Sequence, residues 1–313
     1  MEIPVYLFTG LLESGKTTLI HEVAGEEGFL EPGNTLLIRC EEGEEEFSEE
    51  FLRKYSMILL DVEEAEELNE SFWRKSETDY KPAQIMIEYN GMWTMDTLFD
   101  SGIPGEWFMG GIYSTVNAQT AELYLSNMRG AFMEPLKESN LIIFNRCDEN
   151  IDRVRFRRML KALNPQVQIA FEKMDGSVFA DDLDQVPYDF NQPTINIEGM
   201  DYGLWYVDAM EHPGRYIGKN IHFTAKFCAS MKAEDKYFVP GRHIMTCCEA
   251  DIEFYGYVCY FEGDMPFKHN DWVEVTVEYD YGMCDMYGEE GPILRLVDIK
   301  GCKAPENELV TFT

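Results

Sequence analysis

Basic residues are scarce in this sequence. Its 313 residues include 26 lysines and arginines against 58 aspartates and glutamates, a formal net charge of −32. A field of that sign repels phosphate backbones and anionic membranes, so it argues against nucleic acid as a partner. It also repels nucleotides, so a nucleotide site in this chain needs its own local cations.

Long apolar runs and closely paired cysteines are also missing. No apolar stretch approaches the roughly 20 residues that cross a bilayer. The N-terminus lacks a basic segment followed by a long apolar one. None of the eight cysteines forms C-x-x-C, and six lie after residue 227. We therefore expect a cytoplasmic protein with reduced thiols that is not embedded in a membrane.

What is present near the N-terminus is a match to G-x-x-x-x-G-K-[ST] at residues 10–17. A strand-length apolar run at 3–8 precedes it and a helical pattern at 17–24 follows, the context that this motif requires. Its backbone N–H groups and the helix start favour phosphate oxygens. We expect Lys16 to reach the β- and γ-phosphates of a nucleotide and Thr17 to hold Mg²⁺. The other predicted nucleotide-binding residues of this loop are Gly10, Glu13, Ser14, Gly15 and Thr18.

Strand-like and helix-like segments alternate up to about residue 185. This alternation predicts a P-loop NTPase fold, with a parallel sheet and helices on both faces, over residues 1–186. The strands are expected at 3–8, 35–39, 57–62, 84–88, 111–118, 141–144 and 167–171, and the helices at 17–24, 63–72, 121–133, 152–163 and 179–183.

Two acidic features follow predicted strands. Seven glutamates occupy residues 41–50, at a strand end where open α/β sheets bind ligands. We expect most to be solvated and one or two, with Glu41 as the candidate, to approach the Mg²⁺. Glu88 ends the strand at 84–88, where an acid binds a Mg²⁺-bound water or orients the attacking water.

The tetrapeptide 145–148, Asn-Arg-Cys-Asp, occupies the position of N-K-x-D in GTPases. A carboxylate at Asp148 accepts from guanine N1–H and the N2 amine together, a donor pair that adenine lacks. Asn145 and Asp148 therefore predict a preference for GTP. The alternative is an ordinary polar turn after a strand.

These motifs together resemble the CobW-like GTPases, metallochaperones grouped with the GTPases of urease and hydrogenase maturation. The resemblance covers residues 1–185 and includes Glu41, Gly43, the E-x-x-G at 88–91 and Leu163-Asn164-Pro165. It implies that Lys16 binds phosphate, Thr17 binds Mg²⁺ and Glu88 lies near the γ-phosphate. The family's metal-binding C-x-C-C is missing, since no cysteine occurs between Cys40 and Cys147.

The remainder of the chain has a different pattern. Residues 187–199, with two prolines, are expected to form a linker, followed by a helix at 203–212. Five short strands are expected at 220–227, 243–250, 256–261, 272–279 and 292–298. This spacing predicts an all-β, OB-like barrel over residues 200–313. OB folds that bind single-stranded nucleic acid use basic grooves, and the dominance of acids here argues against that function.

Adjacent thiols at Cys247 and Cys248 are a candidate transition-metal site. In a regular strand they point to opposite faces, so both bind one ion only at a bulge or strand end. Further ligands could come across strands from Cys228, Cys259, Cys284 or Cys302. The competing interpretation is that these are small buried hydrophobes.

The motifs around Tyr216, Cys247 and Trp272 resemble an uncharacterised OB-like domain. It otherwise occurs on membrane proteins encoded beside CobW-like GTPases in bacterial zinc-starvation operons. The resemblance covers residues 200–313 and implies zinc handling without assigning a ligand.

The resulting prediction is a Mg²⁺-dependent GTPase coupled to transition-metal handling, with Zn²⁺ as the expected ion and a metal-receiving client protein as a partner. Catalysis would rest on Lys16 and Glu88, and turnover is expected to be slow because no arginine is placed as a finger. Two alternatives remain: a GTP-gated switch whose β domain contacts a partner, and an ATP-using kinase of the same fold. Homo-oligomerisation is compatible with the sequence, which does not determine it.

Overall fold

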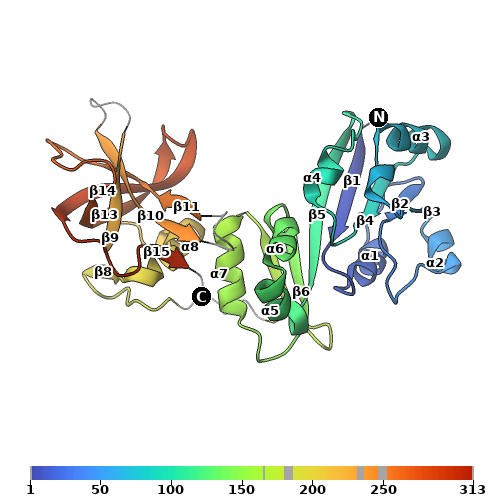
Figure 1. Ribbon diagram of the computed structural model, residues 1–313, viewed down its shortest axis with the longest axis horizontal. Helices are drawn as coiled ribbons and strands as arrows, with labels where there is room; N and C mark the ends of the chain where they lie inside the picture. The colour runs from blue at the N-terminus through green and yellow to red at the C-terminus, as the bar shows by residue number, and fades with distance from the viewer. Residues whose placement is uncertain (1, 165, 180–185, 231–235, 246–251, 312–313) are drawn as a thin grey trace. The chain divides into compact units, whose positions relative to one another are not determined.

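The computed structural model describes residues 2–164, 166–179, 186–230, 236–245 and 252–311. The chain divides into two compact units, residues 1–153 with 166–180 and residues 154–165 with 181–313. Figure 1 shows the elements of both units along the chain.

The first unit is built on a seven-stranded sheet in the order β3-β2-β4-β1-β5-β6-β7, and every neighbouring pair is parallel. The predicted fold class is confirmed for this unit. Its strands are β1 (Ile3–Thr9), β2 (Thr35–Arg39), β3 (Met57–Asp61), β4 (Gln84–Glu88), β5 (Trp107–Asn117), β6 (Leu141–Cys147) and β7 (Gln168–Lys173).

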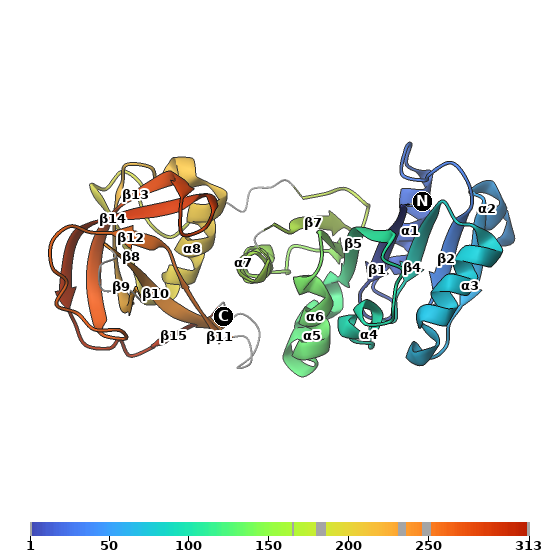
Figure 2. The ribbon, with the colours of Figure 1, turned by 90° about the horizontal axis from the view of Figure 1, so that it is seen from above.

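Alternating apolar residues cover both faces of this sheet. Ile85 and Ile87 of β4 face a cluster that contains Trp73, whereas Met86 between them faces the cluster of Leu19 and Ile20. Helices α3 and α4 therefore cover the face opposite α1 and α2, as Figure 2 shows. The helices along this part of the chain are α1 (Lys16–Gly25), α2 (Glu49–Lys54), η1 (Ala65–Glu67), α3 (Glu70–Tyr80), α4 (Met95–Phe99), α5 (Ala118–Asn127), α6 (Arg129–Lys137) and α7 (Arg153–Leu163).

Two predicted helices of this half are wrong in position or continuity. The helix expected at 63–72 begins instead at Glu70, because the Asn69 side chain caps it by accepting from the Phe72 N–H. The helix expected at 121–133 is two helices, α5 and α6, separated at Met128, whose backbone is not helical. The short helix predicted at 179–183 falls mostly outside the described residues.

Helix α7 belongs to the second compact unit, although it was predicted as part of the first domain. Lys161 donates to the Glu211 carboxylate at 2.6 Å, and Arg157 lies 3.9 Å from the same group. Glu211 ends α8 (Tyr202–Glu211), so these ion pairs join the two helices.

The second unit contains a closed barrel of five strands. Around the ring, β9 pairs with β10, β10 with β12, β12 with β14, β14 with β13, and β13 with β9. The β12–β14 pair is parallel and the other four are antiparallel, so the predicted OB-like barrel is confirmed. The elements are β8 (Thr194–Ile197), η2 (Gly199–Asp201), α8, η3 (Pro213–Arg215), β9 (Asn220–Ala229), β10 (Tyr237–Met245), β11 (Ile252–Gly256), β12 (Val258–Tyr260), β13 (Trp272–Cys284), β14 (Glu289–Gly301) and β15 (Leu309–Thr311).

The segment predicted as a linker contains a strand. β8 pairs in parallel with β9 from Thr194 to Ile197, and Ile195 is a buried core residue. Strand β10 also begins six residues before the predicted strand at 243–250, of which residues 246–250 lie outside the described part. In both places the local composition did not indicate the strand, which is stabilised by pairing with a strand from another part of the chain.

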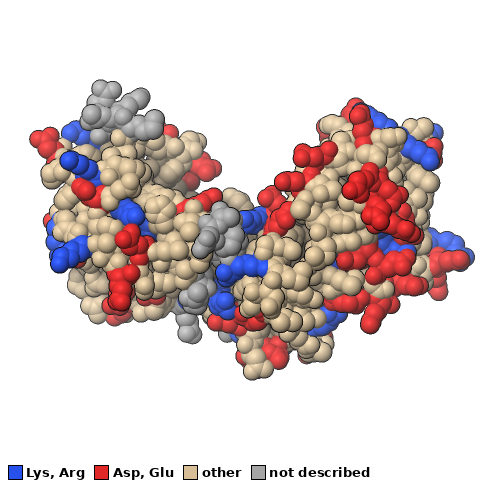
Figure 3. Space-filling model, viewed as in Figure 1, with Lys and Arg blue, Asp and Glu red and all other residues tan. Residues whose placement is uncertain are grey.

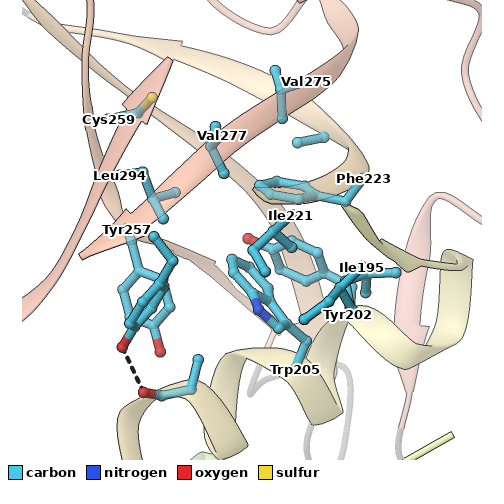
Figure 4. Close-up of a cluster of buried hydrophobic side chains, with 14 of the residues drawn as sticks. Ile195, Tyr202, Trp205, Ile221, Phe223, Tyr257, Cys259, Val275, Val277 and Leu294 are labelled. Carbon is cyan, nitrogen blue, oxygen red and sulfur yellow. Dashed lines mark hydrogen bonds between the residues drawn. The ribbon is translucent and has the colours of Figure 1, made fainter. Parts of the chain in front are cut away.

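An aromatic core fills the barrel (Figure 4). Trp205 of α8 packs on Phe223 of β9 with ring centroids 4.9 Å apart. Buried tyrosine hydroxyls are paired with main-chain carbonyls: Tyr279 donates to Ala209 at 2.6 Å and Tyr202 to Tyr255 at 3.1 Å. Because these hydroxyls are satisfied, the two tyrosine rings are buried without leaving their own polar atoms unpaired, whereas Trp205 Nε1 is buried without a hydrogen-bond partner.

Candidate functional site

The carboxyl ends of the parallel strands bring the predicted site residues to one edge of the first unit's sheet. Glu88 at the end of β4 is in register with Phe8 of β1 and Arg39 of β2. Asn145 of β6 is in register with Asn117 of β5. Four features therefore lie at the same edge of the sheet: the phosphate loop, Glu88, the acidic segment after β2 and the 145–148 tetrapeptide.

The phosphate loop depends on glycine at three points. Gly10 has φ +131°, and a Cβ there would lie 2.3 Å from the Thr115 carbonyl. Gly15, with φ +104°, immediately precedes α1 and lies against the Asn145 side chain. Gly91 packs on the loop itself, since a Cβ there would lie 2.4 Å from the Gly10 carbonyl oxygen. Glycine is therefore needed at the end of E-x-x-G, because a residue without a Cβ lets this backbone lie close to the phosphate loop.

Lys16 is buried, with 4% of its side chain exposed. Its ammonium donates to the carbonyls of Gly10 at 2.8 Å and Leu11 at 3.2 Å and to the Glu41 carboxylate at 2.5 Å. A lysine ammonium has three N–H donors, so these three acceptors use all of them.

Thr17 and Glu88 form the second buried contact of the site. The Thr17 hydroxyl donates to Glu88 Oε1 at 2.5 Å, and Glu88 Oε2 is buried without a hydrogen-bond partner. Burial raises the pKa of Glu88, against the lowering effects of the Thr17 hydrogen bond and the Lys16 charge. Both residues line an open pocket together with Lys16 and Glu41. Adjacent hydroxyl and carboxylate oxygens, one of them unpaired, fit Mg²⁺, which prefers oxygen ligands.

Cys40, the residue before Glu41, does not line this pocket. Its side chain is buried, and burial together with the nearby Glu88 charge raises the pKa of the thiol to about 12. A metal ion at Cys40 would have to displace a proton that burial holds more tightly than in an exposed cysteine.

The 145–148 tetrapeptide is tied directly to the phosphate loop. Asn145 Nδ2 donates to the Ser14 carbonyl at 2.7 Å, and the Arg146 guanidinium donates to the Glu13 carbonyl at 2.9 Å. Asp148 is exposed and accepts from the main-chain N–H and the side chain of Asn150, and these bonds lower its pKa. An ionised, accessible carboxylate is what the N1–H and N2 amine of guanine require.

The sequence did not single out Glu45. Its Oε2 accepts from the Thr18 hydroxyl at 2.6 Å, and its Oε1 lies 3.0 Å from His21 Nδ1. Nothing in a run of seven glutamates distinguishes the two that contact the phosphate loop from those that face solvent. Figure 3 shows acidic side chains gathered on the side of the first unit that holds β2, β3 and α2.

The structure brings no cysteine cluster together in the parts of the chain that it describes. Among those residues no group of three histidine, cysteine, aspartate or glutamate side chains is arranged to hold a metal ion. Cys259 and Cys284 are buried, Cys228 and Cys302 are partly exposed, and all four are free. Cys247 and Cys248 lie outside the described residues.

The C-terminal part of the chain matches a known family. Residues 174–311 match the family model described as the DUF1980 C-terminal domain, which confirms the similarity to an uncharacterised domain expected for this region. A search of curated proteins found no match. Among the helices that the structure describes, none combines the length and apolar character needed to span a bilayer.

Several solved structures are similar to this chain at low identity. The hydrogenase maturation factor HypB from Archaeoglobus fulgidus is 16% identical, with 56% of this chain and 84% of that chain covered and a TM-score of 0.39. The Zn(II)-bound YjiA GTPase from E. coli is also 16% identical, with 74% of each chain covered and a TM-score of 0.43. HypB from Helicobacter pylori in complex with nickel is 13% identical, with 54% of this chain and 78% of that chain covered and a TM-score of 0.36.

Proposed function

We propose that this chain, a phosphate-loop unit followed by a region similar to the DUF1980 C-terminal domain, binds GTP and hydrolyses it with Mg²⁺. The observation that carries the proposal is the pocket at the phosphate loop, where Lys16, Thr17 and Glu88 lie together. A buried cation and a hydroxyl at the start of a helix, with a buried acid at the end of a neighbouring strand, are the groups that phosphoryl transfer to water requires.

Each residue has a distinct part in the proposed reaction. Lys16 neutralises charge that develops on the phosphate oxygens, and the helix that starts at Lys16 adds favourable partial charge. Thr17 and Glu88 hold Mg²⁺ or its water, and the ion, when bound, supplies charge neutralisation on the phosphates. Glu88 orients the attacking water. We place this activity in the cytoplasm, where the free thiols stay reduced.

Asp148→Asn tests the guanine preference. An amide at this position presents a donor to guanine N1–H and its N2 amine, so GTP affinity is expected to fall about 10- to 100-fold while ATP affinity changes little. Titration calorimetry with both nucleotides measures the ratio. Glu149→Gln, at the exposed neighbouring position, is the matched control. Equal affinity of the unmodified protein for GTP and ATP would refute the guanine assignment.

We further propose that GTP turnover is coupled to zinc handling and to delivery of the ion to a client protein. The support is the pair Cys247–Cys248, because adjacent thiols are soft ligands suited to zinc. The protein purified from zinc-supplied cells is expected to contain about one zinc ion per chain, lost in the Cys247→Ser, Cys248→Ser double variant. Elemental analysis measures the content. Cys302→Ser is the control, and zinc retained by the double variant would place the ion elsewhere.

A further inference from the structure

Two carboxylates of one loop contact Lys16 and Thr18, side chains that are predicted to bind a triphosphate. The acidic loop, residues 41–46 between β2 and α2, contributes both. Glu41 binds the Lys16 ammonium at 2.5 Å, with 11% of the Glu41 side chain exposed. Glu45 accepts from the Thr18 hydroxyl at 2.6 Å.

The backbone of the acidic loop is also attached to the phosphate loop. The Glu44 N–H donates to Glu13 Oε1 at 2.8 Å. Gly43 lies close to the same carboxylate, since a Cβ there would be 3.0 Å from Glu13 Oε1. With the contacts of Glu41 and Glu45, the acidic loop is held at three points along the phosphate loop.

These contacts compete directly with phosphate. Carboxylate and phosphate oxygens accept from the same donors, and all three N–H groups of Lys16 are already used by Gly10, Leu11 and Glu41. A phosphate oxygen can bind Lys16 only when one of these acceptors leaves. The two carbonyls belong to the phosphate loop itself, so Glu41 is the acceptor that can move away.

We propose that the acidic loop is an autoinhibitory element, in which Glu41 and Glu45 occupy Lys16 and Thr18 and must be displaced before nucleotide binds. This inference rests on the proposed function. The affinity for nucleotide is lowered by the fraction of molecules in which the contacts are made, so weakening the contacts raises the apparent affinity. Conversely, bound nucleotide releases the acidic loop and frees its carboxylates.

Single glutamine substitutions test the proposal. Glu41→Gln and Glu45→Gln keep the side-chain volume and remove the charge that competes with phosphate, and each is expected to raise affinity for a non-hydrolysable GTP analogue with Mg²⁺ about 5- to 10-fold. Glu42→Gln and Glu46→Gln are matched controls in the same loop. Both control residues are exposed and neither lines the pocket around Lys16. The controls remove the same charge from the field without removing a contact to the phosphate loop, since Glu42 pairs instead with Arg39 at 3.4 Å. Each is expected to change affinity less than twofold.

Each outcome of the calorimetric titration decides between explanations. Equal gains in all four variants would assign the effect to the general acidic field and overturn the proposal. No gain, or weaker binding, in Glu41→Gln and Glu45→Gln while the unmodified protein binds the analogue would overturn it and leave the proposed function intact. Absence of binding in the unmodified protein and in all four folded variants would remove the proposed function as well. Thermal melting of each variant establishes that it is folded.

Discussion

Lys16→Ala is expected to reduce GTP affinity about 100- to 1,000-fold, because two or more charge-assisted hydrogen bonds to phosphate are lost. Lys16 is the buried cation at the phosphate loop, in a chain whose net charge of −32 otherwise repels the nucleotide. Titration calorimetry with GTP and Mg²⁺ measures the change.

Two controls accompany this measurement. Lys75→Ala removes an exposed cation from α3 and is expected to leave affinity unchanged. Because Lys16 also donates to the Gly10 and Leu11 carbonyls, the variant's melting temperature must be compared with that of the unmodified protein. A folded Lys16→Ala protein with unchanged GTP affinity would contradict the phosphate-binding assignment of this loop.

Glu88→Gln is expected to lower GTP turnover about 100-fold or more, since the amide cannot act on the attacking water as the carboxylate does. The same substitution is expected to stabilise the protein at neutral pH, raising its melting temperature by about 2–5 °C. The physical reason is the buried, unpaired Oε2: burial raises the pKa of Glu88, so holding the carboxylate ionised opposes folding.

The stabilisation has a defined pH dependence. Since the pKa of Glu88 is raised in the folded protein, the unmodified protein loses stability as pH rises through that pKa. Below the ordinary glutamate pKa of about 4.3 the residue is protonated in both states and the penalty disappears. The difference in melting temperature between Glu88→Gln and the unmodified protein should therefore shrink toward acidic pH. Glu50→Gln, exposed on α2, should show no such trend. Unchanged turnover with destabilisation at pH 7 would show that Glu88 is a structural residue.

The seven predicted strands of the first unit are all present because each is a short apolar run between turn residues, although β5 begins at Trp107 and β6 continues to Cys147, beyond the predicted bounds. β2 matches its predicted bounds at Thr35 and Arg39, and β4 ends at Glu88 as expected. Helix positions were harder to predict. Glutamate-rich composition suggested a helix from residue 63, whereas a single capping side chain, Asn69, determines where α3 begins. Capping is a specific hydrogen bond, and composition does not distinguish it from the surrounding polar residues.

In the barrel, too, local composition was not enough to predict every element, here because strands pair with distant segments. Its strands are recognisable from alternation and turns, but β8 at Thr194–Ile197 forms only because β9 offers a partner. A four-residue segment with two buried isoleucines, Ile195 and Ile197, is too short to carry a local signal of that pairing. Pairing between such strands depends on the fold, because its hydrogen bonds join residues that are far apart in the sequence. Local composition carries no information about such distant partners.

The sequence by itself determined the phosphate loop, the acid at the end of β4 and the division into a parallel sheet and an OB-like barrel, because each is written in local spacing and periodicity. Only the tertiary structure decided which glutamates of the acidic loop contact the phosphate-binding residues. Glu41 and Glu45 contact Lys16 and Thr18, whereas Glu42 pairs with Arg39 and Glu46 is exposed, although all four belong to one run of similar residues. The contacts depend on the folded sheet, because its strand order places β2 and β1 on either side of β4 and so brings the segment after β2 to the edge that holds the phosphate loop.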